Sequence, residues 1–283
     1  MPPRRLHRSL LAAALALSGL VQAASLPELG DASEAALPHA RERALGEETM
    51  KSLRTAGAAL DDPEIDAYLD SLGRRLLQAD PSLAGQPFRF FAVDSAELNA
   101  FALPGGYVGV NTGLILATQS ESELASVLAH EISHVGQHHI ARQLAAQSGA
   151  QVMSLAALAA AIVAAGTGNG QAAMAAVTGA TAAQAQSQIN YTREHEQEAD
   201  RLGFRLLVDA GFDPRAMAAF FERLQRATRL ADSGATPAWL RTHPLTHERV
   251  AEAEDRAFAR PYRQVTDSPE YHLARALVRS YAG

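Results

Sequence analysis

The chain has 283 residues, of which 47% are hydrophobic, which is enough for a large core and excludes a globally disordered protein. The formal net charge is −6 and the sequence pI is about 5.9 without any basic stripe, which argues against nucleic acid as a partner. The lack of cysteine argues against both a disulfide framework and a lipoprotein.

Residues 1–23 are predicted to be a cleavable signal peptide. A positively charged start at 4–8 precedes an apolar run, Leu10 to Val21, and the small residue Ala23 provides a cleavage site. The run is too short to span a bilayer comfortably, which disfavours the alternative of a membrane anchor. Export of a chain without disulfides fits the bacterial periplasm, so we expect the mature protein there.

Residues 24–60 are expected to form an N-terminal arm and a helix, because apolar positions recur at helical spacing from about Pro38 onward. Asp61-Asp62-Pro63 marks the start of a second helix, since proline is favoured in the first helical turn. This helix, 64–78, carries apolar residues on one face: Ile65, Tyr68, Leu69, Leu72 and Leu76.

Three short segments that follow have the composition of β-strands. They are Phe88–Val93, Ala100–Leu103 and Tyr107–Val110, and the turn Pro104-Gly105-Gly106 separates the last two. Together they predict a small β-sheet within a mainly helical, α+β protein.

A long helix is predicted over about 121–147, introduced by the capping box Ser120-x-x-Glu123. The next segment, 148–188, is an insertion dominated by Ala, Gly, Gln, Thr and Ser. Its small side chains favour a pair of closely packed helices. The alternatives are a surface that contacts a membrane or a membrane protein, and a mobile lid.

The C-terminal part is predicted to be helical. The expected helices cover 193–210, 214–230, about 246–260 and 269–281, and Gly211 ends the first of them. We expect one metallopeptidase-sized domain over 61–262 and a helical tail over 263–283.

The pentapeptide His130-Glu131-Ile132-Ser133-His134 is the first candidate for a metal site. Histidines four residues apart project from one face of a helix, so both imidazoles can bind one tetrahedral ion. Glu131 points about a quarter turn away and can act as a general base towards water at that ion. The alternative is a polar stripe on the helix whose side chains are satisfied by hydrogen bonds. The motif follows apolar residues such as Leu128 and is therefore expected to be buried, where polar side chains without a partner are costly.

The third ligand has to come from another segment. A metzincin would carry Gly and His at the positions of Gln137 and Ile140, so that pattern is excluded. His138 lies about 12 Å along the predicted helix from His130, at about 1.5 Å per residue, which is too far to share one ion. We therefore expect His138 and His139 on the polar surface of the helix.

Glu196 is the better candidate for the third ligand. Glu196 and Asp200 lie four residues apart on one face of the 193–210 helix. Glu196 would complete a set of two His and one Glu with one open position, and Asp200 can accept the other ring N–H of a ligand histidine. The alternative is an acidic, solvated helix face, which we expect for Glu194 and Glu198.

Four stretches of the sequence form a recognisable set. They are Leu98-Asn99-Ala100-Phe101 with Gly105-Gly106, Ser126–His134, Glu196–Arg201, and Thr242-His243-Pro244-Leu245 with Arg249. From about Asp61 onward the sequence resembles the HtpX-like and Oma-like zinc metallopeptidases, peptidase family forty-eight of the metallo class, and within it the periplasmic β-barrel assembly-enhancing proteases. The resemblance implies a zincin-like domain with an active-site helix and a substrate-binding edge strand.

The resemblance also implies roles for individual residues. One zinc ion per chain would be bound by His130, His134 and Glu196, with Glu131 as the catalytic base and Asp200 supporting a ligand. A substrate strand would add to the edge of the sheet, in agreement with the general tendency of extended peptides to pair with open strand edges. The implied substrate-binding residues are Asn99, Tyr107, Val108, Gly109 and Val110.

The same resemblance places His243 and Arg249 near the zinc, as catalytic residues that stabilise the transition state. His243 can instead fill the open metal position and hold the enzyme inactive, or cap the helix that follows. Relatives of this kind continue into tetratricopeptide repeats, whereas this sequence stops at Gly283, about where those begin. We therefore expect a shorter relative, or a partner that supplies the missing surface.

The expected function is zinc-dependent hydrolysis of peptide bonds in the periplasm, in protein quality control at or near the outer membrane. Polypeptides, misfolded outer-membrane proteins among them, are the expected substrates. Zinc is preferred because two imidazoles and a carboxylate in an open tetrahedron suit it. The alternative is a chaperone or assembly factor that uses the site mainly for binding.

Overall fold

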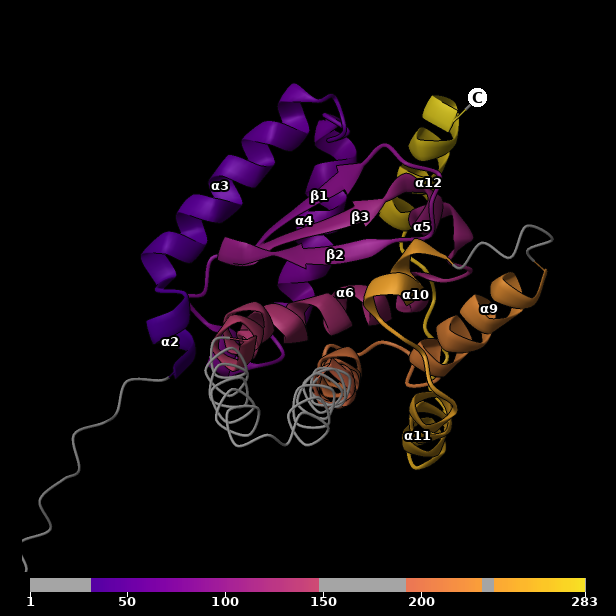
Figure 1. The fold of residues 1–283 in the computed structure, drawn as a ribbon. Coiled ribbons are helices and arrows are strands. Elements are labelled where there is room, and N and C mark those ends of the chain that lie inside the picture. Colours follow the sequence, from indigo (N-terminus) through magenta and orange to yellow (C-terminus); the bar gives the residue numbers. More distant parts are fainter. Residues whose placement is uncertain (1–31, 148–191, 231–236, 283) are drawn as a thin grey trace, which may run out of the picture.

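The computed structural model describes residues 32–147, 192–230 and 237–282. Within them the chain is mainly helical with one small sheet, which confirms the predicted α+β class (Figure 1). The predicted signal peptide and the insertion at 148–188 lie outside the described residues.

The elements follow the predicted order, with short helices added between them. The strands are β1 (Arg89–Val93), β2 (Ala100–Leu103) and β3 (Tyr107–Asn111). The helices are α2 (Ala32–Ala36), α3 (His39–Thr55), α4 (Pro63–Leu77), α5 (Thr112–Ala117), α6 (Glu121–Gly136), α9 (Ala216–Leu230), α10 (Ala238–Thr242), α11 (His247–Phe258) and α12 (Pro269–Ala282). Residues 139–147 and 192–209 are also helical, and 3₁₀ turns cover Pro81–Leu83 and Pro104–Gly106.

The strand order of the sheet is β1-β3-β2, so β3 lies in the middle. It pairs in parallel with β1 and antiparallel with β2. The expectation that Tyr107, Val108, Gly109 and Val110 form the open edge is therefore wrong: all four are buried, with a partner strand on either side. The outer strand on the side of α6 and α10 is β2, while Ala59 bridges Val93 at the opposite edge (Figure 1).

The two helix starts that frame the sheet form as their sequences predict. The Asp62 carboxylate accepts hydrogen bonds from the backbone N–H groups of Glu64 and Ile65, at 2.8 and 3.0 Å. At α6, the Ser120 hydroxyl accepts the Glu123 N–H at 3.2 Å. The apolar face predicted for α4 is buried as a whole and packs on β1, α6 and α12.

The helix predicted over 121–147 is in fact broken at Gln137 and His138. His138 has a φ of 51°, in the left-handed region, so the chain changes direction after α6. A second helical stretch, 139–147, then starts at His139. This break decides which histidines meet at the site described below.

Helix α3 packs across the turn between β2 and β3. A Cβ atom at Gly46 would lie 2.1 Å from the carbonyl oxygen of Pro104, so only glycine permits this close approach. Met50 of the same helix is buried with Phe91, Val93 and Tyr107 in a small second core. The N-terminal helix is thus part of the packed body.

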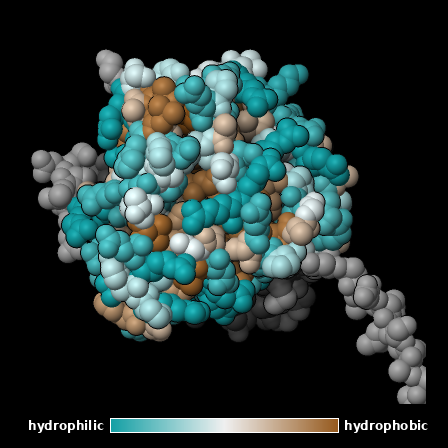
Figure 2. All heavy atoms as spheres, turned by 180° about the vertical axis from the view of Figure 1, so that it is seen from behind, coloured by the Kyte–Doolittle hydropathy of each residue, from teal (hydrophilic) through white to brown (hydrophobic). Residues whose placement is uncertain are grey.

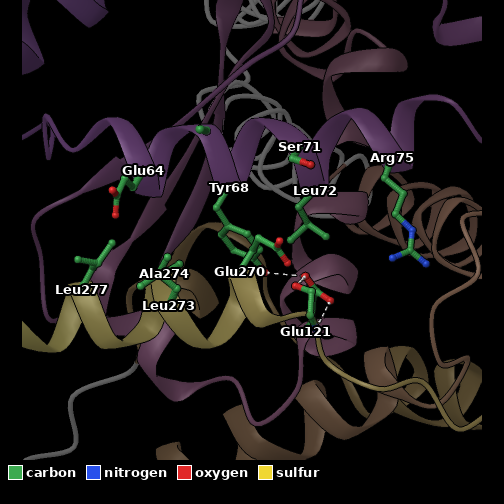
Figure 3. A pocket seen from close by; sticks show the side chains of 12 residues that line it. Glu64, Tyr68, Ser71, Leu72, Arg75, Glu121, Glu270, Leu273, Ala274 and Leu277 are labelled. Carbon is green, nitrogen blue, oxygen red and sulfur yellow. Dashed lines mark hydrogen bonds between the residues drawn. The ribbon is translucent and has the colours of Figure 1, made fainter.

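Helix α12 packs beside α4, and a cavity of about 400 Å³ opens between them (Figure 3). In its wall Glu121 accepts hydrogen bonds from Tyr68 at 3.2 Å and from Ser268 at 2.6 Å. The face seen in Figure 2 is mainly hydrophilic, with hydrophobic residues in small separate patches among those described. No helix within the described ranges is both long and apolar enough to cross a bilayer.

Candidate metal centre

Four side chains from three separate segments converge on one point. His130 and His134 come from α6, Glu196 from the 192–209 helix, and His243 from the residue that ends α10. One ligand atom from each lies within 4.8 Å of all the others. The structure thus brings together the three predicted ligands and adds a fourth donor.

The separations between these donors suit a tetrahedral ion. The Nε2 atoms of His130 and His134 are 3.0 Å apart, and each lies 3.4 Å from a carboxylate oxygen of Glu196. His243 Nδ1 is 3.1 Å from Glu196 and 3.4 Å from His130 Nε2. Zinc bonds of about 2.0–2.1 Å in a tetrahedron place neighbouring ligands about 3.3 Å apart. The residues present therefore fit zinc.

Close packing of two helices sets this geometry. A Cβ atom at Gly203 would lie 3.0 Å from the backbone of Ala129 and His130, so the 192–209 helix touches α6 directly there. Glu196, two turns earlier on that helix, is only 3% exposed and faces the two histidines. The small residue at 203 is thus a condition for the carboxylate to reach the α6 ligands.

The buried charges at the centre hold one another in their ionised forms. Burial opposes ionisation of Glu196, but hydrogen bonds from His130, His134 and His243 hold its pKa well below the usual value. Burial likewise disfavours the protonated form of His130, yet contacts with Asp200 and Glu196 raise its pKa to about 9. Burial lowers the pKa of His134. A cation bound at this point would compete with protonation of His130, because a ligand imidazole must be neutral.

Asp200 lies behind the ligands, as its spacing from Glu196 predicts. Its Oδ1 atom is 3.0 Å from Nδ1 of His130, although off the line of an ideal hydrogen bond. Arg249 binds the same carboxylate through two contacts of 2.6 and 2.8 Å. Burial opposes the charge of Asp200, but the Arg249 guanidinium and His130 lower its pKa.

Arg249 does not face the open side of the centre. Besides Asp200 it contacts Glu196 at 2.9 Å and donates to the carbonyl of Pro244 at 2.8 Å, and it is only 2% exposed. These contacts engage four of its five N–H donors on the side of Asp200 and Glu196. The structure therefore favours a positioning role for Arg249, and the catalytic role expected from the resemblance stays a prediction.

Glu131 carries the one buried oxygen that the site leaves without a hydrogen bond. It is 0% exposed, and its Oε1 atom accepts from the Trp239 indole at 3.3 Å and lies 3.5 Å from His243 Nε2. Its Oε2 atom has no hydrogen-bond partner among the described residues. An unpaired buried carboxylate oxygen is costly, and next to a metal it is the arrangement that a base for water requires.

A cavity of about 250 Å³ opens in front of Glu131, His134 and Glu196. Phe101 and Ala102 of β2 form its wall on the side of the sheet. Because Asn99 O accepts the Asn111 N–H, the antiparallel register leaves the N–H and C=O of Ala100 and Ala102 pointing away from β3. Among the described residues, the N–H and C=O of Ala102 therefore have no strand partner beside the candidate metal centre.

Asn99 precedes β2 but does not line this cavity. Its side-chain oxygen is buried without a hydrogen-bond partner among the described residues. The cavity beside α12 in Figure 3 shares no lining residue with the metal centre.

The sequence reasoning missed His139. It is buried, and its Nδ1 atom is 2.8 Å from Nδ1 of His134, the nitrogen that faces away from the other ligands. Its Nε2 atom is 3.2 Å from Glu198, which Arg142 also binds at 2.8 Å. The expectation that His139 and Glu198 lie on polar helix surfaces is wrong, because the helix break turns His139 inward. Gly136 is the only sequence signal for that break.

Comparison with known proteins identifies the family of the chain. Residues 63–257 match peptidase family M48, more than half of the chain. The chain belongs to peptidase family M48. It is 37% identical to the beta-barrel assembly-enhancing protease of Escherichia coli over 96% of this chain and 57% of that protein. For the Yersinia pestis protein of the same name, the identity is 35%, over 91% of this chain and 52% of the relative.

A more distant relative is the mitochondrial metalloendopeptidase OMA1 of Arabidopsis thaliana, with 26% identity over 82% of this chain and 44% of that protein. The chain thus spans about half the length of the curated relatives that it matches.

Proposed function

We propose that this chain is a zinc-dependent endopeptidase of the bacterial periplasm, acting in protein quality control at or near the outer membrane. The observation that carries the proposal is the unpaired Oε2 of Glu131 beside the converging donors of His130, His134 and Glu196. The names of the relatives from Escherichia coli and Yersinia pestis refer to a protease and to beta-barrel assembly, which supports polypeptides as substrates. We propose that misfolded outer-membrane proteins are among them. Residues 61–262 are proposed as the catalytic unit.

In this proposal His130, His134 and Glu196 hold one zinc ion, and Asp200 with Arg249 fixes the ligands behind it. When bound, zinc supplies a Lewis acid that acidifies water and polarises the scissile carbonyl. Glu131 takes the proton of the attacking water at its free Oε2 atom and passes it to the leaving amine.

Strand β2 is the proposed docking edge for the substrate. The outward N–H and C=O groups of Ala102 can pair with an extended peptide, which would place it along the cavity in front of Glu131. This reassigns substrate binding from Tyr107–Val110 to the neighbouring strand.

His243 is proposed to close the site at rest. Its Nδ1 atom lies at contact distance from His130 Nε2 and Glu196, and its ring stacks on Trp239 at 4.8 Å between centroids. A fourth protein donor completes a tetrahedron and leaves no place for water. Turnover then requires the segment around His243 to move, after which its ring can assist the transition state.

Zinc content and casein cleavage, measured for wild type, Glu131→Gln and His243→Ala, test both proposals. We expect Glu131→Gln to keep the zinc content of the wild type and to lose at least about 100-fold in turnover, since it removes the base. Retained proteolysis in that variant would refute the assignment. Faster cleavage by His243→Ala at equal zinc content supports the closed resting state, and slower cleavage supports the role in the transition state. Unchanged turnover with an intact fold refutes both roles.

The name of these relatives refers to assembly as well as to proteolysis, which favours an assembly factor as the second candidate. In that case Glu131→Gln protein would still perform the cellular task. Outer-membrane protein levels in cells that carry only this variant distinguish the two functions.

A further inference from the structure

Three further metal-binding side chains meet on the opposite side of the break in the active-site helix. His39 and Glu42 lie on α3, one turn apart, and His138 is the left-handed residue that follows α6. One potential ligand atom from each lies within 4.8 Å of the other two. None of the three belongs to the centre at His130, and the family comparison assigns them no role.

The surroundings of His39 are those of a metal-ligating imidazole. Its Nε2 atom is 3.2 Å from one carboxylate oxygen of Glu34, whose other oxygen accepts the His39 backbone N–H at 3.4 Å. A carboxylate at Nε2 favours the proton there and leaves a lone pair on Nδ1. That Nδ1 atom lies 3.6 Å from Glu42 Oε2, too far for a hydrogen bond. Two acceptors that face each other at this distance leave room for a cation.

His138 is held towards α3 by its backbone. Its φ of 51° is the only positive value among the non-glycine residues that the structure describes. This conformation brings its ring to 5.2 Å from that of His39, between centroids. Glycine or asparagine is the usual residue at such a position after a helix, and histidine is among the residues that tolerate it.

The three side chains line a cavity of about 510 Å³, together with Pro87, Gly105 and other residues of the turn regions nearby. Solvent reaches this cavity, because His39 keeps 64% of its side chain exposed. Water can therefore complete the coordination of a bound ion.

We propose that His39, Glu42 and His138 form a second site for a divalent transition metal, with zinc as the reference ion. Two imidazoles and one carboxylate are the donors that zinc, copper and nickel share. An ion here ties α3 to the junction between α6 and the 139–147 helix. His139, next along the chain, contacts the ligand His134, so this ion braces the helix break beside the first centre.

Zinc binding to the full chain tests the proposal. We use the Glu131→Gln background to prevent self-digestion, and dialyse it against buffered free zinc in the micromolar range. We expect two zinc ions per chain, and one after His39→Gln with His138→Asn, because asparagine tolerates the left-handed backbone. The matched control is His247→Gln, which removes an exposed histidine of α11 and should leave the count at two.

The proposal is overturned if the Glu131→Gln chain binds only one zinc ion. It is also overturned if the variant that adds His39→Gln and His138→Asn still binds two. His130→Ala with His134→Ala removes the first centre and should leave one zinc bound by the second. Loss of all zinc in that variant, with circular dichroism showing a folded chain, also overturns it. The proposed peptidase function is untouched by any of these results, since it depends on the first centre alone.

Discussion

Arg249 brings a positive charge into the interior, where it contacts the carboxylates of Glu196 and Asp200. Burial opposes the charged guanidinium, but hydrogen bonding to Asp200 more than compensates and raises the pKa of Arg249. Charges are buried in proteins only when paired, because desolvation is costly. We therefore expect the group of Arg249, Asp200 and Glu196 to act as one unit that orients the proposed metal ligands.

Replacing Arg249 by Met should destabilise the metal-free protein by about 3–5 kcal/mol, because two buried carboxylates lose their partner. Zinc affinity should fall with stability, and Arg249→Lys should restore part of both, since it keeps the charge. Urea unfolding and chelator competition measure the two effects. Full zinc affinity with only a reduced turnover number would instead support the oxyanion role that the sequence suggested.

At the level of elements, the edge strand and the helix break do most to shape the site. Strand β2 is short and antiparallel to β3, and its outward groups face the cavity. The break at Gln137 and His138 lets the chain turn back, so that the His139 ring contacts the His134 ring. Neither feature contains a metal ligand of the first centre, yet both determine what surrounds it.

Ala102→Pro tests most directly whether substrate docks on the edge of strand β2. In the observed register the N–H of Ala102 does not donate to β3. Proline at this position therefore removes only the outward N–H, and proline is tolerated in an edge strand. We expect the specificity constant for peptides to fall by up to about tenfold, the worth of one hydrogen bond, with unchanged zinc content. Ala102→Ser keeps the N–H and serves as the control. Equal losses in both variants would contradict a backbone contact.

At the scale of the whole molecule, the metal centre joins parts of the chain that are distant in sequence. The ligands come from α6, from the 192–209 helix and from the end of α10. No single segment can form this centre, so an ion bound there favours the assembled fold over the unfolded chain.

Chelation should therefore lower the melting temperature reversibly. At free zinc about a thousand times the dissociation constant, binding stabilises the folded chain by about 4 kcal/mol. The measurement is calorimetry of the Glu131→Gln protein with and without chelator, followed by zinc readdition. The same experiment on His130→Ala with His134→Ala is the control, and an equal shift there would place the stabilising ion elsewhere.

Features that depend on local spacing could be predicted from the residues alone. Proline after Asp62 and the capping box at Ser120 predicted two helix starts, since capping involves neighbouring backbone groups. Four-residue spacing put His130 with His134, and Glu196 with Asp200, on common helix faces.

The order of the strands and the surroundings of the candidate ligands became clear from the three-dimensional packing. A strand's own sequence does not say whether one or two partners flank it, so β3 was taken for the edge that β2 provides. Similarly, one residue in the left-handed conformation redirected His139 from the expected surface to the interior. These outcomes depend on long-range packing, which residue spacing along the chain does not encode.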